Sequence, residues 1–403
     1  MTTRQPLNCI FTGKECRVVV SGGGEGLEMG YNICFKSGIL IDLLIISVRQ
    51  EQTMPGFRNC LTKPLSKLWP LALMALAAPG WSVAADWTLS YTADGQPDIE
   101  GIWSNATQTR LERAADLGDK RSYTNAEAAA LEARVKVGME RSMAPSDANR
   151  SPPADGNVAS AYNSFWLERG SNVTLIDGEY RTSMIVEPSN GQIPWLPIDE
   201  RRPSQLSRWL AMPGVEPFDG PELQTIGERC LLFWDFRTSN SSAGPPMMPM
   251  IYNNNYQIVQ SPGYVLIYAE MMHDARIVRL DAQHRAPHMV QWMGDSVGHW
   301  EEDTLVVVTK NMHPQQSHFG SSENITITER FQRTGEDDIV YSFTMDDPSV
   351  YREPWKAQMQ MKQRPEDRIY EYACHEGNYA LGGILGGARV QERESSEGMQ
   401  ADQ

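Results

Sequence analysis

Hydrophobic and polar residues alternate along most of the chain after residue 178, with the period of two that half-buried strands show. Short segments rich in Gly, Pro, Asn, Asp or Glu interrupt this alternation, and such segments favour hairpin turns. The turns are predicted at Pro188-Ser189-Asn190-Gly191, Ser261-Pro262-Gly263, Glu301-Glu302-Asp303 and Thr334-Gly335-Glu336, and two more strands over 355–363 and 369–376. Almost no helical pattern follows residue 220. The sequence therefore predicts a mainly β fold, an antiparallel meander closed as a calycin-like barrel or folded as a sandwich.

The segment 124–143 has a different pattern, because its apolar residues recur with helical spacing. Thr124 stands at its start and Glu127 follows three residues later, which is the arrangement of a capping box. We expect a short helical N-terminal part within residues 86–177, a β-rich core domain over 178–392 and a disordered tail over 393–403.

A third pattern lies upstream of residue 86. Lys63 and Lys67 precede an apolar run over 68–78, and the small residues Ser82 and Ala84 follow it. This order is typical of a secretory signal peptide, and eleven apolar residues are too few for a bilayer core that needs roughly 20. We expect residues 54–85 to be a cleaved signal peptide, 1–53 to be a discarded leader or an over-long start, and the protein to be periplasmic or secreted.

Cysteine usage and charge agree with export. Four of the six cysteines precede residue 85, which leaves Cys230 and Cys374 to form one disulfide in an oxidising compartment. The chain has 36 basic and 51 acidic residues, of which 8 and 5 precede residue 85, so the remainder carries a net charge of −18. Nucleic acid and anionic membranes are therefore poor partners, and we expect a small-molecule or glycan-derived substrate.

The segment 264–280 reads as one long strand with a polar interruption. Alternate residues give an apolar face from Val265 to Ile277 with His273 in the middle, while Glu270, Asp274 and Arg276 occupy the other face. A bulge near His273 is plausible, because seventeen residues exceed the usual length of a strand. Either His273 is a general base tuned by Asp274, or it is a structural histidine with Asp274 and Arg276 paired on the outside.

Two other polar clusters could contribute to the same site. Three asparagines lie between two tyrosines and form either a loop or a polar wall for substrate; the residues are Tyr252, Asn253, Asn254, Asn255 and Tyr256. The second cluster follows Cys374, where a disulfide would hold His375 and Glu376 in place.

Metal binding is the weaker hypothesis. His284 and His288 are four residues apart, but Pro287 between them argues against the helical display of zinc proteases. We expect no metal or other cofactor, although the sequence leaves open whether His273, His288 and His375 meet at one ion.

Several long motifs resemble those of a family of uncharacterised secreted bacterial proteins to which no reaction is assigned. They are YNNNYQIVQ, EMMHDARIVRLD, QWMGDSVGHWEEDTLVVVT, FGSSENITITERF and YEYACHEGNY, and the similarity covers about residues 98–389. The resemblance supports the boundaries of the mature protein and implies no substrate. Members usually have Gly at the position of Glu302, which leaves that turn type open. The Gly101-x-Trp103 motif is similar to the start of lipocalin barrels, on a three-residue match.

Two functions are compatible with these residues. The first is an exported lyase, isomerase or hydrolase that acts without a metal. His273 would be its base, Arg276 and the asparagines would stabilise negative charge, and Tyr252 or His375 would return the proton. The alternative is a lipocalin-like binding protein for a hydrophobic small molecule, in which His273 is structural.

Overall fold

The computed structural model describes residues 87–145, 149, 151, 167–232, 243–251, 253–316 and 318–401, and three short strands near the N-terminus. Those strands are β1 (Cys9–Thr12), β2 (Glu15–Val18) and β3 (Asn32–Cys34), which form an antiparallel sheet within a first compact unit. All other elements belong to a second compact unit. The predicted signal peptide, 54–85, lies outside the described residues, as does most of 1–53.

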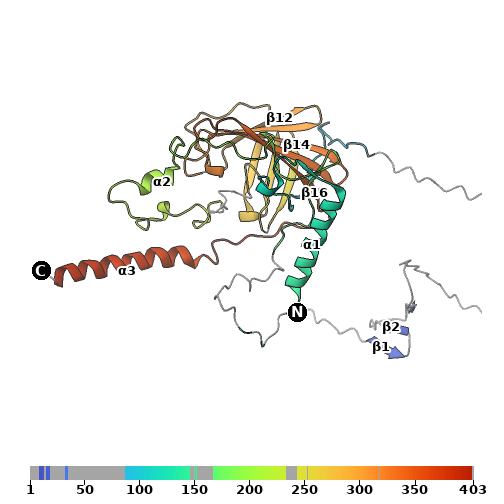
Figure 1. Cartoon of the computed structure of the whole chain (residues 1–403), viewed down its shortest axis with the longest axis horizontal. Coiled ribbons are helices and arrows are strands. Elements are labelled where there is room, and N and C mark those ends of the chain that lie inside the picture. The colour runs from blue at the N-terminus through green and yellow to red at the C-terminus, as the bar shows by residue number, and fades with distance from the viewer. Residues whose placement is uncertain are drawn as a thin grey trace, which may run out of the picture. The chain divides into compact units, whose positions relative to one another are not determined.

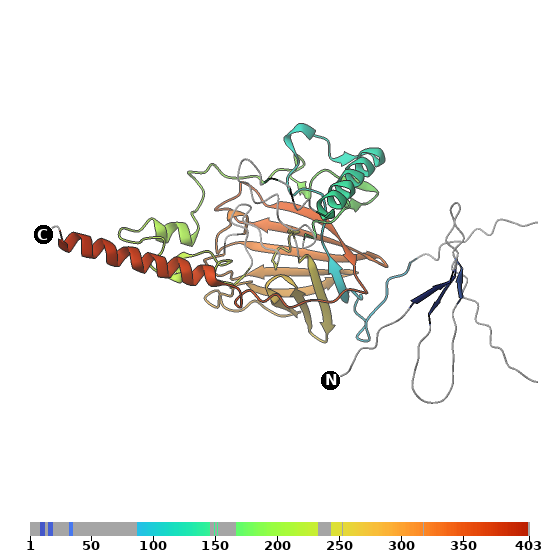
Figure 2. The ribbon, with the colours of Figure 1, turned by 90° about the horizontal axis from the view of Figure 1, so that it is seen from below.

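The second unit is built on a closed β-barrel of nine strands (Figures 1 and 2). In chain order these are β4 (Gly101–Ser104), β9 (Asn255–Ser261), β10 (Tyr264–Ala269), β11 (Ala275–Leu280), β12 (Asp295–Glu301), β13 (Thr304–Lys310), β14 (Thr326–Gly335), β15 (Asp338–Asp346) and β16 (Trp355–Gln363). Neighbours pair along the chain from β9 to β16, and β4 closes the ring between β16 and β9. The prediction of a mainly β barrel is confirmed. The barrel is mixed, because β11 and β12 run parallel.

Three of the four predicted hairpins form. They join β9 to β10, β12 to β13 and β14 to β15 at the predicted turns. In the turn between β12 and β13, Glu302 has a φ of 52° and is the first central residue. A positive φ at the first central residue of a two-residue hairpin favours glycine, which has no Cβ to oppose this conformation.

The fourth hairpin, around Pro188–Gly191, is wrong. The strand before this turn, β8 (Ile185–Glu187), pairs with β16, and the residues after it contribute only an isolated bridge between Trp195 and Tyr351. A small separate sheet forms from β5 (Ser122–Tyr123), β6 (Leu175–Ile176) and β7 (Glu179–Arg181). The expected strand over 369–376 is also wrong, since these residues form turns and irregular backbone.

The described helices are α1 (Asn125–Met143), α2 (Gln205–Leu210) and α3 (Tyr379–Ala401). The capping box of α1 is confirmed, because Thr124 accepts from the backbone of Glu127 and the Glu127 side chain accepts in return. Short 3₁₀ turns occur at η1 (Ala115–Leu117), η4 (Pro221–Leu223), η5 (Met271–His273) and η6 (His318–Gly320).

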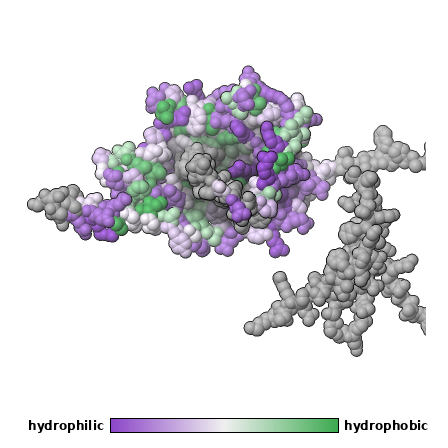
Figure 3. Space-filling model, turned by 60° about the horizontal axis from the view of Figure 1, so that its bottom comes forward, coloured by the Kyte–Doolittle hydropathy of each residue, from purple (hydrophilic) through white to green (hydrophobic). Residues whose placement is uncertain are grey.

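Helix α3 differs from two expectations. It lies after residue 220, where almost no helix was expected, and it continues past residue 393, where a disordered tail was expected to begin. Its paired glycines, Gly382-Gly383 and Gly386-Gly387, each have open space around the Cβ position. Glycine disfavours helices, so the helical spacing of the half-buried residues was not recognised in the sequence. These residues are Leu381, Ile384, Leu385 and Ala388. Arg389 donates to the carbonyls of Phe218 and Asp219, and Figure 3 shows apolar side chains gathered around this part of the surface.

The expected division into 86–177 and 178–392 is not seen either. Strand β4 lies in the predicted N-terminal part but is a member of the barrel, between β9 and β16. The described residues from 87 onward therefore share one core.

Aromatic side chains fill the centre of the barrel. The fully buried set is Trp103, Tyr256, Phe331, Tyr341, Phe343 and Trp355. Ring centroids in the chain from Phe331 through Tyr341 and Phe343 to Trp355 lie 4.9, 5.9 and 5.6 Å apart. These distances suit aromatic pairs in a packed core.

The two ends of the barrel differ in their connections. Because β9 to β16 alternate in direction except at β11 and β12, all three tight hairpins lie at one end. The other end carries the β10–β11 turn and the longer loops 311–325 and 347–354. We call this loop-rich end the barrel mouth.

Candidate functional site at the barrel mouth

The predicted long strand 264–280 is a hairpin. Strand β10 ends at Ala269, η5 reverses the chain, and β11 begins at Ala275, with Tyr268 opposite Ala275. Met272 and His273 have φ values of 62° and 44°, a conformation that non-glycine residues rarely adopt. The break anticipated near His273 is therefore a complete turn at the barrel mouth.

This turn reverses which residues face inward. Val265, Ile267 and Ala269 are buried as predicted, but beyond the turn the buried residues are Arg276 and Val278, and Ile277 is 60% exposed. The expected outward position of Arg276 is wrong. A turn whose residues leave the strand conformation does not preserve the alternation on which the expectation depended.

One inner row of side chains can be followed across three strands from their register. Tyr256 pairs with Ala269, and the backbone N–H of Ala269 donates to the carbonyl of Asp274 over 2.8 Å. Asp274 has extended φ and ψ angles of −78° and 134°, and it stands two residues before the inward Arg276. Asp274 therefore lies on the inner face, with only the small side chain of Ala269 between it and Tyr256.

A buried polar network lies beneath this row. Arg276 and Glu329 form a bidentate ion pair, in which Nη2 is 2.9 Å from Oε1 and Nη1 contacts Oε2. Tyr341 donates to the same Oε1 over 2.7 Å and accepts from the backbone N–H of Met247. The network is out of contact with water, because Arg276 is 3% and Glu329 0% exposed.

The network favours a charged Arg276 and a neutral Tyr341, because the pKa values of both groups are raised. Burial opposes the charge of Arg276, but Glu329 outweighs this and raises the pKa of the guanidinium. Burial, followed by the charge of Glu329, raises the pKa of Tyr341 well above its usual value. Burial likewise raises the pKa of Tyr256, whose hydroxyl accepts from Asn105 over 3.3 Å.

Asp274 is the titratable group of the site. Burial raises the pKa of its carboxyl to about 7, and the charge of His273 opposes this only in part. The Oδ2 atom is buried and has no hydrogen-bond partner. A carboxyl with such a pKa exchanges a proton at neutral pH, which an exposed aspartate does not do.

Two other buried atoms of inward-facing residues also lack partners. They are Oδ1 of Asn105, which binds Tyr256 through its amide nitrogen, and Nε of Arg276. Buried polar atoms are usually hydrogen-bonded, so each of these atoms lacks the stabilisation that a partner would give.

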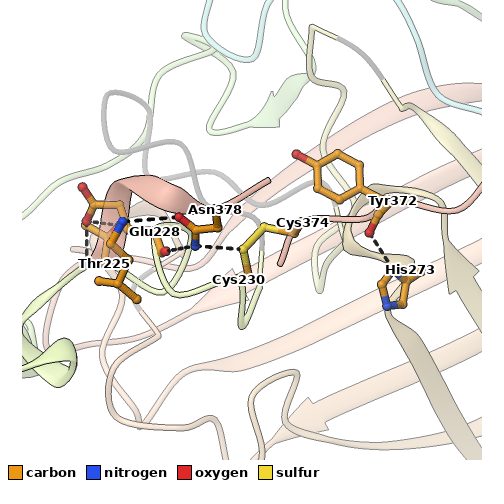
Figure 4. The surroundings of a disulfide bond; sticks show 8 residues. Thr225, Glu228, Cys230, His273, Tyr372, Cys374 and Asn378 are labelled. Atoms are coloured by element: carbon orange, nitrogen blue, oxygen red, sulfur yellow. Dashed lines mark hydrogen bonds between the residues drawn. A yellow bond between two sulfur atoms is a disulfide. The ribbon is translucent and has the colours of Figure 1, made fainter. Parts of the chain in front are cut away.

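The outer side of the hairpin has a different set of contacts. Nδ1 of His273 lies 2.8 Å from the carbonyl oxygen of Tyr372, and Figure 4 shows the ring turned toward it. Glu270 accepts from the side chain of Asn255 over 2.8 Å and from the backbone N–H of Tyr370 over 3.2 Å. We call residues 370–378 the C-terminal strap, since the hairpin holds it through these contacts.

The predicted disulfide fastens the same strap. Cys230 and Cys374 are bonded, with Cα atoms 5.8 Å apart, and Asn378 donates to the carbonyl of Glu228 and contacts Sγ of Cys230 (Figure 4). His375 and Glu376 follow Cys374 but are exposed, and neither side chain bonds a described residue. The motif around His273 and the motif around Cys374 therefore do meet. Their contacts join side chains of the hairpin to backbone atoms of the C-terminal strap.

The asparagine cluster separates into different environments. Asn254 is buried and bonds Glu168 and Met250 in the loop, and Asn253 is a turn residue with a φ of 55°. Asn255 faces the outer group and Tyr256 the inner one. Tyr252 lies outside the described residues.

Three members of the inner network were not anticipated: Asn105, Glu329 and Tyr341. Glu329 carries a readable signal, because it replaces an apolar residue between the inward Ile327 and Phe331 of one strand. The same alternation that singled out His273 would have found it. Nothing in the local pattern around Asn105 indicates its role.

Within the described ranges, no three His, Cys, Asp or Glu side chains are grouped as a metal would require. None of the described helices has the length and apolar character of a membrane span. Comparison with known proteins adds no relative: no family model, no curated protein and no solved structure matches the chain.

Proposed function

We propose that the protein is an enzyme that performs acid–base chemistry at the barrel mouth, with Asp274 as the group that transfers the proton. The observation that carries the proposal is the Asp274 carboxyl, which is half-buried, has a pKa of about 7 and keeps one oxygen without a partner. A general acid or base works best when its pKa lies near the pH of operation. An elimination, an isomerisation or a hydrolysis would each use such a group.

The neighbouring residues have supporting roles in this proposal. Asn105, Tyr256 and Arg276 would orient the substrate, and Glu329 holds Arg276 in place through two hydrogen bonds. The bidentate pair fixes the guanidinium plane, so positions are set before substrate arrives.

His273 receives a different role from the one its sequence context suggested. Its Nδ1 donates to a carbonyl on the outer side, so the ring anchors the C-terminal strap. Its charge also lowers the pKa of Asp274 against the larger effect of burial. We therefore propose that His273 positions and tunes the site, while Asp274 transfers the proton.

The disulfide and the aromatic core bear on the compartment of the protein and on the alternative binding function. The disulfide supports folding in an oxidising compartment, and we propose the periplasm or the exterior of the cell. The lipocalin-like alternative is less well supported, because aromatic rings fill the barrel centre where its ligand would bind.

The test begins with a substrate screen on the secreted protein, using neutral sugars and polyols, uronate-containing glycans, aromatic esters and small hydroxy acids. For a confirmed substrate, Asp274→Asn should lower kcat by roughly 100-fold to 10,000-fold without lowering the melting temperature. Asp337→Asn is the matched control, since Asp337 is exposed beside a hairpin turn at the opposite end. Full activity of the Asp274 variant would refute the proposal.

A further inference from the structure

A cleft of about 260 Å³ opens beside strands β13 and β14, and its lining includes no residue of the candidate site described above. Three segments form it: the loop 281–294, the end of β13 with residues 311–314, and residues 323–326 at the start of β14. Because β11 and β12 run parallel, the chain between them must return along the barrel. We call this returning segment, 281–294, the crossover loop, and it supplies one wall of the cleft.

Hydrogen bonds hold the crossover loop against the opposite wall. Asn311 donates through its side chain to the carbonyls of Arg285 and Ala286 over 3.1 and 3.3 Å. The backbone N–H of Gln291 donates to the carbonyl of Asn311 over 3.1 Å, and that of His313 donates to the carbonyl of Gln291 over 2.8 Å. The cleft is therefore formed before a ligand arrives, which lowers the entropic cost of binding.

Half of the lining is apolar. The apolar residues are Pro287, Val290, Met312, Pro314 and Ile325. Val290 is 40% exposed, so a ligand that covers it removes apolar surface from water. The ligand must be small, because sites for drug-sized molecules span about 300 to 1,000 Å³.

The lining contains one cation and one carboxylate, Lys310 and Glu323. The Oε1 atom of Glu323 already contacts Arg202 and lies 3.6 Å from Arg208. Lys310 is exposed, and its ammonium group bonds no described residue. The cation of the lining is therefore free for a ligand, whereas the carboxylate is occupied.

Thr326 places a second donor beside this ammonium group. Thr309 pairs with Ile327, so the next residue along each strand brings Lys310 opposite Thr326. Side chains directly opposite each other in an antiparallel pair lie on the same face of the sheet. The hydroxyl of Thr326 bonds no described residue either, so the cleft offers two donors side by side.

Asp295 lies opposite Lys310 on β12 but is occupied by other groups. It accepts from Arg279 over 2.9 Å and from the backbone N–H of Arg285 over 2.8 Å, and Nδ1 of His284 lies 3.1 Å away. The ammonium group of Lys310 is not among its partners.

Cations outnumber carboxylates around the cleft. We count the charges of the lining, those paired with them or opposite them in the register, and Asp347, which accepts from the backbone N–H of Ser322. The five cations are Lys310, Arg202, Arg208, Arg279 and Arg285, and the four carboxylates are Glu323, Asp295, Asp346 and Asp347. Protonation of His284 adds a further positive charge. An anion thus meets a locally positive surface, although the chain as a whole has a net charge of −15.

We propose that the cleft binds a small monocarboxylate with an apolar body, an aromatic acid for example, at a site separate from Asp274. One carboxylate has two acceptor oxygens, so it accepts from Lys310 and Thr326 together while its apolar body covers Val290. Lys310 repels an amine, and an uncharged analogue lacks the ion pair. Binding here needs no acid–base chemistry and is independent of the proposed function.

The test compares benzoate, benzyl alcohol and benzylamine, which share one carbon frame, and adds acetate, which has no apolar body. Binding to the full chain is followed by ligand-observed NMR near pH 7 at concentrations up to tens of millimolar. Benzoate should bind at least about fivefold more tightly than each of the other three probes.

Lys310→Met locates the site, since it removes the charge and keeps a long side chain at an exposed position. The variant should bind benzoate and benzyl alcohol with affinities within about twofold of each other. The matched control is Lys136→Met, because Lys136 is exposed on α1 and is absent from the lining of the cleft. This control and Asp274→Asn should both keep the wild-type preference for benzoate.

The proposal is overturned if benzoate fails to bind, or if any of the other probes binds as tightly. It is also overturned if Lys310→Met keeps the preference for benzoate, which would place binding elsewhere. Loss of benzoate binding in Asp274→Asn would assign the carboxylate to the barrel mouth and would likewise contradict a separate site.

Discussion

The two faces of the β10–β11 hairpin use similar residue types for opposite purposes. On the outer face, His273 and Glu270 make hydrogen bonds to the C-terminal strap, and only the Oδ1 atom of Asn255 is left without a partner. On the inner face, Asp274, Arg276 and Asn105 each keep a buried atom unpaired. Among the described residues, the outer face has one unpaired buried atom, whereas the inner face has three.

This difference separates residues that build the structure from residues that are available to act. An unpaired buried polar atom costs about 1 to 3 kcal/mol, so such atoms are not retained for stability. Residues that reduce stability without a structural return are typical of active sites. The inner face fits that description and the outer face does not.

The largest expected effect on stability comes from breaking the inner ion pair. Glu329→Gln leaves Arg276 charged and buried without its partner, and we expect a loss of about 3 to 5 kcal/mol in the free energy of unfolding, measured by urea denaturation. The control is the double variant Arg276→Met with Glu329→Met, which removes both charges and should lie much closer to the wild type. A loss below about 1 kcal/mol for Glu329→Gln would show that the pair is not buried as described.

Removal of the disulfide tests how the C-terminal strap is held on the outer side of the hairpin. Cys230→Ser with Cys374→Ser should lower the free energy of unfolding by roughly 2 to 5 kcal/mol, since the bond closes a loop of 144 residues. Hydrogen exchange should increase first in residues 370–378, with β13 and β14 still protected. An equal increase in those strands would contradict the separation of strap from barrel.

A smaller effect is expected at His273. His273→Gln removes the anchor on Tyr372 and should cost about 1 kcal/mol, mainly as faster exchange in the strap. Turnover on a confirmed substrate should change by less than about tenfold, because the substitution leaves the Asp274 carboxyl in place. A fall of 100-fold or more at an unchanged melting temperature would return the role of base to His273.

Much of the barrel could be predicted from local pattern. The strands from β9 to β16 alternate clearly, and the turns at Pro262, Glu302 and Gly335 lie where the alternation stops. The disulfide followed from the count of cysteines. The hairpin at Pro188–Gly191 failed because its two arms find distant partners, which no local pattern records.

The site was predicted in its location but not in its arrangement. Tyr256, Asp274 and Arg276 were all named, yet the inward direction of Arg276 depends on a turn whose exact length the alternation does not give. The partner of Arg276 lies 53 residues away and that of His273 lies 99 residues away. Such pairings require the closed topology, so the separation of inner and outer faces could only come from the structure.

The most direct test of the account is the pH dependence of stability contributed by Asp274. Its pKa rises from 3.8 to about 7 on folding, so its protonated form is favoured by the fold, and stability is lost as pH rises from about 4 through 7. His318, fully buried with its pKa lowered to about 4, acts in the opposite direction, and its effect cancels when the wild type is subtracted from Asp274→Asn.

Unfolding free energies of the two proteins should therefore be measured by urea denaturation between about pH 5 and about pH 8. The advantage of Asp274→Asn over the wild type should grow with rising pH by about 2 kcal/mol, after allowance for the partial exposure of the carboxyl, and should level off above the pKa of about 7. A difference that stays constant over this range, or one that shrinks as pH rises, would show that Asp274 titrates as an ordinary surface carboxylate and would contradict the central claim.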